Sequence, residues 1–562
     1  MTQPAPQPQP APALPPSSLP RRRKPEVLAP AGNLRGLKTA VDFGADAVYC
    51  GGKAFGMRSA PKNLSLEDFE EGARYAHERG ARVYVTLNVL PRNNEVESIR
   101  EYIGQLGDTG IDALIVTDIG VMMTAHAVAP NLELHVSTQA GVTNYGAANA
   151  LYELGARRVV LAREMDLQAV RDIRARIPED MDVECFVHGA MCMAFSGRCL
   201  FSNYLTGRDG NHGECAQSCR WKYSIVEEKR PGEYYPIEQT EEGAYLFNSQ
   251  DMCMMEHIDD LIDSGATSLK IEGRSKSAYY IAAMTNAYKT AVNEYMIQRG
   301  FEDRDGNVLK PFRDRVIRPS DPDFPAFAEV AAREPDRIMA HADEAFSGVP
   351  GERPTAAPEP SDVSSVPSSV PSSTSLPASP SASTASSADP DDLSYHARST
   401  RRKSNTAAEI LPDGWLHAPV RPAPPVTLPD WLLDEPNKVA HRDYSTGFYY
   451  PERKVTQNTN RSAYFRAWMV VGEVLGWSAE EGGRVTIMSR NKIEPGQHVE
   501  FLLPGEPPLE YDLPADGLRD ADGNWVAAIN NPAHVFSFPC PHRVPVNAAI
   551  RSRTKRPTLK AE

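Results

Sequence analysis

Short apolar runs recur along the first half of the chain, and a helical pattern of apolar and polar positions precedes most of them. Several of these runs directly follow a glycine, the residue that most readily takes the left-handed conformation at a helix end. Three further strands are predicted at 27–32, 132–139 and 182–189. The glycine pattern predicts helix-to-strand junctions in FGADAVYCGG, RGARVYVTLNV, TGIDALIVTD, LGARRVVLARE and SGATSLKIEG, at Gly44, Gly80, Gly110, Gly155 and Gly265.

The helices between these strands carry their own start signals. In SLEDFEEGARYAHERG, Ser65 is placed to cap a helix and Asp68 stands three positions later, as in a capping box. Near-continuous apolar strands that alternate with helices indicate a parallel sheet covered by helices. Eight such units predict an α/β fold, a (β/α)8 TIM-like barrel over residues 25–300. An open doubly wound sheet is the alternative, but APAGNLRG lacks the G-x-G-x-x-G pattern typical of it.

Composition divides the rest of the chain. Residues 1–24 are rich in Pro, Ala and Gln, and the linker 354–430 begins with a Pro/Ser-rich run, so both are predicted to be disordered. Residues 301–353 are predicted to form a helical or irregular extension of the barrel. Residues 431–562 contain short strands with frequent turns, which indicates a small C-terminal antiparallel β-barrel with a basic tail.

The overall charge limits the class of protein. A formal net charge of −14 excludes a protein that coats nucleic acid through its bulk charge, but it permits a local basic patch. No run approaches the ~18 apolar residues that span a bilayer, so we expect a cytoplasmic protein with no membrane partner. In that reducing compartment, clustered cysteines indicate metal or redox chemistry. The basic patch consists of Arg543, Arg551, Arg553, Lys555, Arg556 and Lys560.

Half of the eight cysteines lie within 28 residues: Cys192, Cys199, Cys215 and Cys219, separated by six, fifteen and three residues. Four converging thiolates are the ligand set of an iron–sulfur cluster or of a structural zinc site. Zinc usually takes two C-x₂₋₄-C knuckles, and only the last pair approaches one, so the spacing favours iron–sulfur. Cys253, at the start of a helix predicted over 252–265, is an alternative ligand.

Polar residues at strand ends are candidates for catalysis, because the active sites of such barrels lie at the carboxyl ends of the strands. Strand seven ends at His188, and Glu272 and Arg274 follow strand eight. These three are the predicted acid/base and anion-binding groups, with Arg274 suited to hold a carboxylate or phosphate through paired hydrogen bonds. The same face is expected to carry Asn88, Asp118, Thr138, Gln139, Arg163 and Glu164.

Several motifs together resemble the signature of the collagenase-like peptidase family, family thirty-two of the peptidases of unknown catalytic type. They are ECFVHGAMCMAFSGRCLFS at 184–202, PAGN at 30–33, GECAQSCRW at 213–221, SLKIEGRSKS at 268–277 and HRDYSTGF at 441–448. The family includes enzymes of oxygen-independent hydroxylation with four-iron clusters on cysteines. The resemblance places Cys192, Cys199 and Cys215 on cluster ligands, and leaves the fourth ligand between Cys219 and Cys253.

The resemblance also implies a function. Similar proteins hydroxylate the wobble uridine of transfer RNA through prephenate-linked chemistry, a cytidine of ribosomal RNA, or the ring of a quinone precursor. We therefore expect a tRNA-modifying enzyme that forms 5-hydroxyuridine, with a 4Fe-4S cluster and a prephenate-derived co-substrate. The expected partners are tRNA, whose anticodon loop presents unpaired bases at low cost, and iron–sulfur assembly factors.

Two other functions remain open. The family name implies a collagenase-like peptidase, but the chain contains no H-E-x-x-H and no G-x-S-x-G, and cysteines that bind a cluster are not free to attack a peptide bond. The third possibility is a non-catalytic RNA-binding factor with a structural cluster. In the C-terminal domain the aromatic residues Phe465, Trp468, Phe501 and Trp525 are predicted to be core residues rather than platforms for base stacking.

Overall fold

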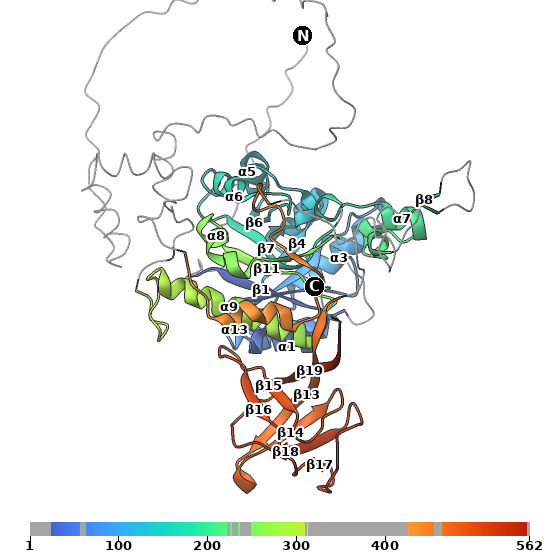
Figure 1. Cartoon of the computed structure of the whole chain (residues 1–562). Coiled ribbons are helices and arrows are strands. Elements are labelled where there is room, and N and C mark those ends of the chain that lie inside the picture. Colours follow the sequence, from blue (N-terminus) through green and yellow to red (C-terminus); the bar gives the residue numbers. More distant parts are fainter. Residues whose placement is uncertain are drawn as a thin grey trace, which may run out of the picture.

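Eight parallel strands close into a barrel in the computed structural model (Figure 1). The last of them, β11, pairs in parallel with both β1 and β7 and so joins the two edges of the sheet. The predicted TIM-like barrel is therefore confirmed. The barrel strands are β1 (Glu26–Ala31), β2 (Ala47–Gly51), β3 (Arg82–Leu87), β4 (Ala113–Val116), β5 (Glu133–Val136), β6 (Ala156–Val160), β7 (Asp182–Ala190) and β11 (Ser268–Ile271).

Helices alternate with these strands and cover the outside of the barrel. The predicted capping box is present: Ser65 Oγ accepts from the Asp68 backbone N–H at 3.2 Å, and the Asp68 carboxylate accepts from the Ser65 N–H at 2.9 Å. The five predicted junction glycines all have a φ between +74° and +106°. The helices are α1 (Leu34–Asp42), α2 (Leu66–His77), α3 (Val96–Gly107), α4 (Ile119–Val128), α5 (Tyr145–Glu153), α6 (Leu167–Arg174), α8 (Ile258–Asp263) and α9 (Ala278–Gln298).

The structure describes residues 24–56, 63–192, 194–221, 225–226, 234–235, 249–309, 312, 425–453 and 464–558. Most of the predicted N-terminal tail, extension and linker lie outside these residues, as does Lys560 of the basic tail. Within the described part of the chain, no helix combines the length and the apolar character needed to cross a membrane.

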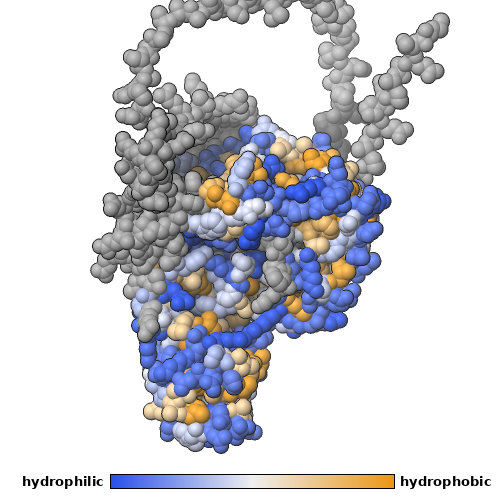
Figure 2. Space-filling view, turned by 90° about the vertical axis from the view of Figure 1, so that its right-hand side faces the viewer, coloured by the Kyte–Doolittle hydropathy of each residue, from blue (hydrophilic) through white to orange (hydrophobic). Residues whose placement is uncertain are grey.

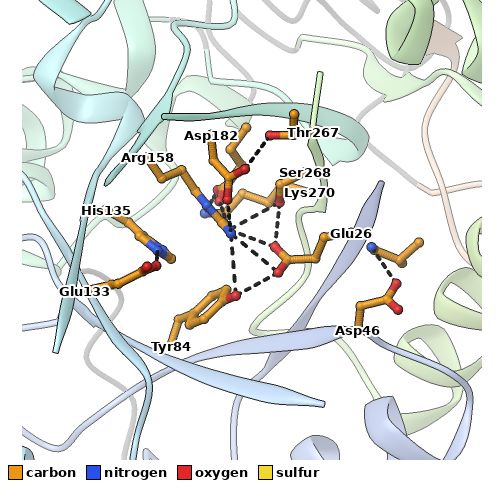
Figure 3. A network of polar contacts seen from close by, with 12 residues as sticks. Glu26, Asp46, Tyr84, Glu133, His135, Arg158, Asp182, Thr267, Ser268 and Lys270 are labelled. Atoms are coloured by element: carbon orange, nitrogen blue, oxygen red, sulfur yellow. Dashed lines mark hydrogen bonds and ion pairs between the residues drawn. The ribbon is translucent and has the colours of Figure 1, made fainter. Parts of the chain in front are cut away.

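A buried charged network lies inside the barrel (Figure 3). The Arg158 guanidinium is fully buried and donates to Glu26 at 2.7 Å and to Glu184 at 2.9 Å. Lys270 Nζ donates to the second oxygen of Glu184 at 2.6 Å. Burial alone would raise the pKa of Glu184, but Lys270 and Arg158 outweigh it and hold that pKa below its ordinary value. These ion pairs tie β1, β6, β7 and β11 together from within.

The chain leaves the barrel after β7 and returns to it through β10 (Asp251–Cys253). The prediction of a helix over 252–265 is wrong at its start, since the helix α8 begins only at Ile258. Residues 251–253 are extended because they find strand partners on both sides: β7 and β12 (Tyr444–Ser445). The excursion between β7 and β10 contains α7 (Phe201–Thr206), β8 (Ile225–Val226) and β9 (Tyr234–Tyr235).

The residues that follow the linker return to the barrel before the second domain begins. The helix α13 (Asp430–Asp434) and the strand β12 lie against the barrel, and β12 extends the barrel sheet beyond β10. Side chains of this segment join the apolar core of the barrel, namely Leu428, Leu432, Val439 and Tyr449. Residues that the sequence assigned to the C-terminal domain thus contribute to the barrel.

The second domain is a seven-stranded antiparallel sheet with an apolar core of its own, which confirms the predicted antiparallel architecture. Phe501 is buried in this core as predicted, whereas Trp525 is 61% exposed. The domain lies against the side of the barrel formed by α1, α9 and α13 (Figure 1). Its strands are β13 (Arg466–Ser478), β14 (Arg484–Ser489), β15 (His498–Phe501), β16 (Leu509–Asp512), β17 (Arg519–Asp520), β18 (Val535–Pro539) and β19 (Ala549–Thr558).

Candidate functional site

The carboxyl ends of the barrel strands carry a ring of polar side chains. Thr117 Oγ1 donates to the backbone carbonyl of Asn88 at 3.2 Å and lies 3.5 Å from Gln139 Oε1. The Asn88 amide in turn donates to Ser137 Oγ at 3.4 Å. Asp118 has a different role, because its carboxylate accepts from the Val121 N–H and caps α4. The ring therefore contains Asn88 and Gln139 of the predicted set, while Asp118 is a helix cap.

Arg274 reaches across this mouth from the loop that follows β11. Its Nη1 donates to Thr86 Oγ1 at 2.8 Å, and the residue is only 8% exposed. Two glycines make room for the loop. A Cβ on Gly51 would lie 2.2 Å from Arg274 Nη2, and a Cβ on Gly32 would lie 2.2 Å from the Arg274 carbonyl oxygen. Gly32 of PAGN and Gly51, the first glycine of VYCGG, are thus explained by the close approach of one arginine.

Glu272 lies in the same mouth, beside a second arginine. Its Oε2 is 3.9 Å from Arg163 Nη2 and 3.5 Å from Tyr49 Oη. Arg163 is held in place by a hydrogen bond from Nη1 to the carbonyl of Ala190 at 2.9 Å, and its guanidinium stacks 3.9 Å from the centre of the Phe186 ring. The mouth therefore brings together one carboxylate and two guanidinium groups, all of them largely buried.

His188 lies on the other side of the barrel wall. Glu184 and Phe186 point into the barrel, and regular alternation along β7 would point His188 inward as well. The register between β7 and β11 shifts at this point, where His188 pairs with Ile271, and His188 does not continue the alternation. Its Nδ1 is 3.3 Å from Tyr288 Oη of α9, in a box formed with the rings of Tyr280 and Tyr444. The structure thus brings Glu272 and Arg274 together and separates His188 from them.

Burial lowers the pKa of His188 to about 3. This value already includes the charged neighbours: Asp251 raises the pKa, and His441 and Lys276 lower it. The imidazole is therefore neutral at physiological pH, which suits a buried packing and hydrogen-bonding group.

The cysteine excursion is fastened over the mouth by contacts with several strand ends. The backbone N–H and the hydroxyl of Ser196 both donate to Glu164, each at 2.7 Å. Arg198 Nε donates to the carbonyl of Gln139 at 2.5 Å. On the other side, His212 is 3.0 Å from Glu95 in the loop after β3. These contacts explain the role of Glu164, which the sequence placed on this face without a partner.

The four clustered thiols lie close enough to influence one another. Burial and the thiols of Cys192, Cys215 and Cys199 raise the pKa of Cys219, against the lowering effect of Arg220. Two sulfurs already accept backbone hydrogen bonds: Cys199 Sγ from Phe201 N–H at 3.3 Å, and Cys215 Sγ from Gln217 N–H at 3.4 Å. Such N–H groups stabilise thiolate ligands, since they direct positive charge at the sulfur.

Asn211 positions one of these cysteines. Its side-chain oxygen accepts from the Cys199 N–H at 3.0 Å, and its amide nitrogen donates to the Cys199 carbonyl at 3.2 Å. Because the same residue is hydrogen-bonded through its backbone to Asp209 and Leu90, Cys199 is coupled to the loop that follows β3. The sequence offered no signal for this asparagine beyond its position between two cysteines.

Cys253 occupies a different environment. It lies on β10 opposite His188, and its sulfur is 3.8 Å from Tyr288 Oη. Burial raises the pKa of its thiol to about 11, and among its neighbours the contacts with Met255 and Tyr288 lower it while Glu256 raises it. The thiols that affect Cys219 are thus those of its own segment, and Cys253 lies in the box of aromatic rings around His188.

The end of the cysteine excursion contacts the beginning of the second domain. Arg220 Nη1 donates to Tyr464 Oη at 3.3 Å, and Lys276 Nζ lies 4.4 Å from the centre of the same ring. Hydrophilic residues predominate on the face of the molecule that carries α7, with smaller hydrophobic patches on both domains (Figure 2). The mouth, the cysteines and the second domain therefore adjoin one another.

Comparison with known proteins places this site within a family. Residues 32–319 match peptidase family U32, and residues 466–551 match the peptidase family U32 C-terminal domain. The first match contains the barrel mouth and the whole cysteine segment. The second match contains most of the antiparallel sheet.

Three similar proteins carry different names. The tRNA hydroxylation protein P1 of Bacillus subtilis is 41% identical over 273 residues, which are 49% of this chain and 64% of that protein. An uncharacterized protease of Methanocaldococcus jannaschii is 41% identical over 48% of this chain and 66% of its own length. The 23S rRNA 5-hydroxycytidine C2501 synthase of Escherichia coli is 37% identical over 49% of this chain and 40% of its own length. The chain thus spans less than two thirds of these relatives.

Proposed function

Because this chain belongs to peptidase family U32, and its relatives include proteins named for the hydroxylation of tRNA and rRNA, we propose that it is an RNA-modifying enzyme. The proposed reaction is the oxygen-independent hydroxylation of the wobble uridine of tRNA, which forms 5-hydroxyuridine. One observation carries this proposal: the family match covers the segment in which the four cysteines are fastened over the polar mouth of the barrel. An anticodon-loop base is already unpaired and can enter such a mouth at low cost.

We propose that Cys192, Cys199, Cys215 and Cys219 hold an iron–sulfur cluster, of the 4Fe-4S type. The two N–H···S contacts, at Cys199 and Cys215, suit thiolate ligands of such a cluster. When bound, the cluster would supply one-electron chemistry.

The residues of the mouth have proposed roles in binding and proton transfer. Arg274 would bind a carboxylate of the prephenate-derived co-substrate or a phosphate of the RNA through paired hydrogen bonds, with Arg163 as the second cation. Glu272 is the carboxylate in this mouth and would act as the general base of the reaction. We assign His188 to positioning, since it lies behind the wall that carries these groups.

A peptidase is the alternative that the family name and the Methanocaldococcus relative raise. Peptide hydrolysis by a cysteine requires a thiolate, which means a lowered pKa. Burial raises the pKa of Cys50 to about 12 and that of Cys185 to about 12, so neither is an activated nucleophile. The remaining thiols of the mouth are those assigned to the cluster.

The proposal is tested in a strain that lacks the gene. We expect the nucleosides of its tRNA, analysed by mass spectrometry, to lack a 5-hydroxyuridine derivative that the wild-type gene restores. Cys192→Ala should fail to restore it, whereas Cys540→Ala, which removes a buried cysteine of the second domain, should succeed. Unchanged nucleosides in the deletion strain, with gelatin degraded by the purified protein, would favour the peptidase. Unchanged nucleosides with intact RNA binding would favour a non-catalytic RNA-binding factor.

A further inference from the structure

Four cations and two aromatic rings form a series from the cysteine segment to the strands β13 and β19 of the second domain, at the end that faces the barrel. We call this set the basic strip, and it consists of Arg220, Lys276, Tyr464, Arg466, Trp468 and Arg553. Its residues come from four parts of the chain that are far apart in sequence. Within the part of the chain that the structure describes, none of its four cations forms an ion pair.

The first half of the basic strip is centred on Tyr464. Its hydroxyl accepts the hydrogen bond from Arg220 and its ring lies under Lys276, so that cations from the excursion and from the loop after β11 meet on one aromatic side chain. Arg220 directly follows Cys219 and affects the pKa of its thiol. The strip therefore begins beside the proposed cluster.

The second half lies on β13 and β19. Trp468 and Arg553 are directly opposite each other in this antiparallel pair, and the guanidinium of Arg553 lies 5.4 Å from the centre of the indole ring. Arg466 stands two residues before Trp468 on the same strand, across a register shift in its pairing with β19. Both arginines are exposed. An aromatic ring and a cation thus lie side by side on the sheet, with a second exposed arginine close by along β13.

A neighbouring arginine has a structural role and differs from the arginines of the basic strip in its burial and its ion pairs. Arg551 stands two residues before Arg553, is fully buried, and forms ion pairs with Glu435 and with Glu500. The environment of Arg553 differs because it holds no carboxylate partner among the described residues. The buried cation fastens the domain to the barrel, and the exposed cations of the strip are available to an external anion.

We propose that the basic strip binds the sugar–phosphate backbone of the RNA beside the nucleotide that enters the mouth, an inference that rests on the proposed function. Two exposed and two half-buried cations beside aromatic rings match the two needs of a single-stranded RNA, which are charge neutralisation and base stacking. The five residues from Tyr464 to Trp468 span about 14 Å when extended. The strip leads directly to the cysteine segment, where the modified base would lie.

The proposal is tested by removing two charges from the strip. The double variant Arg466→Gln/Arg553→Gln is compared with a control, Arg176→Gln/Arg519→Gln. The control removes an exposed arginine just after α6 and a half-buried arginine from β17. Both variants change the net charge by the same amount. The probe is an unmodified tRNA transcript with a wobble uridine, and its dissociation constant is measured by fluorescence anisotropy with the full-length protein over a range of salt concentrations.

We expect the strip variant to bind about tenfold more weakly at physiological salt and to flatten the slope of log K against log salt by about 2, while the control matches the wild type. Equal losses in both variants, or no loss in either, would overturn the proposal. So would a strip-dependent interaction with polyglutamate in place of RNA, which would assign the strip to an acidic protein. If the wild type hydroxylates tRNA and the strip variant binds tRNA normally, only the proposed role of the basic strip is wrong. If the wild type neither binds nor hydroxylates tRNA, the proposed function of the protein is wrong as well.

Discussion

Arg442 and Asp251, which are 191 positions apart, form a buried ion pair between the segment that follows the linker and the strand β10. The guanidinium donates to one carboxylate oxygen from Nε at 3.0 Å and from Nη2 at 2.5 Å, and the Arg442 backbone N–H donates to the other at 3.1 Å. Asp251 is 3% exposed and Arg442 is 1% exposed. This pair accounts for the arginine of HRDYSTGF and fixes β12 beside β10.

Replacement of Arg442 by Leu should lower the free energy of unfolding by about 3–5 kcal/mol, because it leaves the Asp251 carboxylate buried without its partner. The value is obtained from urea denaturation of the full-length protein. Arg176→Leu is the matched control, since Arg176 pairs with Asp172 only at the surface, and it should change the stability by less than about 1 kcal/mol. Adding Asp251→Asn should recover part of the loss in a double-mutant cycle. Equal stability of Arg442→Leu and the control would contradict this account.

The burial of His188 should make stability depend on pH. Its pKa is about 3 in the folded protein and about 6.5 in the unfolded chain. Below pH 6.5 the unfolded chain takes up a proton that the folded protein does not, so the unfolding free energy falls as the pH falls toward 3, by about 1.4 kcal/mol per pH unit. His188→Gln should lose this part of the slope between pH 6.5 and 4.5. At pH 8 the difference in unfolding free energy between the two proteins measures the effect of the substitution on packing alone. Equal slopes of the unfolding free energy against pH below 6.5 would exclude His188 as the cause.

Two cysteine variants separate the possible fourth ligands. After anaerobic purification, Cys219→Ala should lose most of its iron, its sulfide and its absorbance near 400 nm, because its thiol belongs to the interacting set. Cys253→Ala should keep all three, since that sulfur lies against Tyr288 on the opposite side of β7 from the mouth. Iron and sulfide are determined chemically. The reverse result would transfer the fourth position to Cys253 and require the excursion to rearrange when the cluster binds.

The close approach of Gly51 to Arg274 predicts that a single methyl group disturbs the mouth. In Gly51→Ala the new Cβ would lie 2.2 Å from Arg274 Nη2, so the guanidinium must leave Thr86. We expect kcat/KM for the proposed tRNA hydroxylation to fall by about 100-fold, a typical cost of displacing a positioning group by about an ångström.

Gly104→Ala is the control for this variant. Its Cβ would meet only Val128, at an ordinary 3.6 Å, on the surface of α3. It should retain full activity and gain a little stability, because alanine favours the helix. Equal activity of the two alanine variants would show that the position of Arg274 does not matter for the reaction.

Much of the barrel could be predicted from the sequence because its signals are local. The glycines at the helix ends, the Ser65 cap and the apolar strand runs each report a conformation that a few neighbouring residues decide, and the structure contains all of them. The polar residues at the strand ends and the cysteines after strand seven also predicted where the mouth lies, because the active sites of such barrels lie at the carboxyl ends of the strands.

Other features were decided only by tertiary contacts. Residues 251–253 form a strand rather than the start of a helix because β7 and β12 flank them, and no local pattern encodes a partner nearly 200 residues away. His188 lies outside the mouth because of a register shift that becomes visible only when β7 pairs with β11. The meeting of Arg220 and Lys276 on Tyr464 likewise requires three distant segments to be folded together. The sequence by itself determined which elements form and which chemistry they carry, whereas long-range packing decided which of those side chains share a site, because that depends on contacts between residues far apart in the chain.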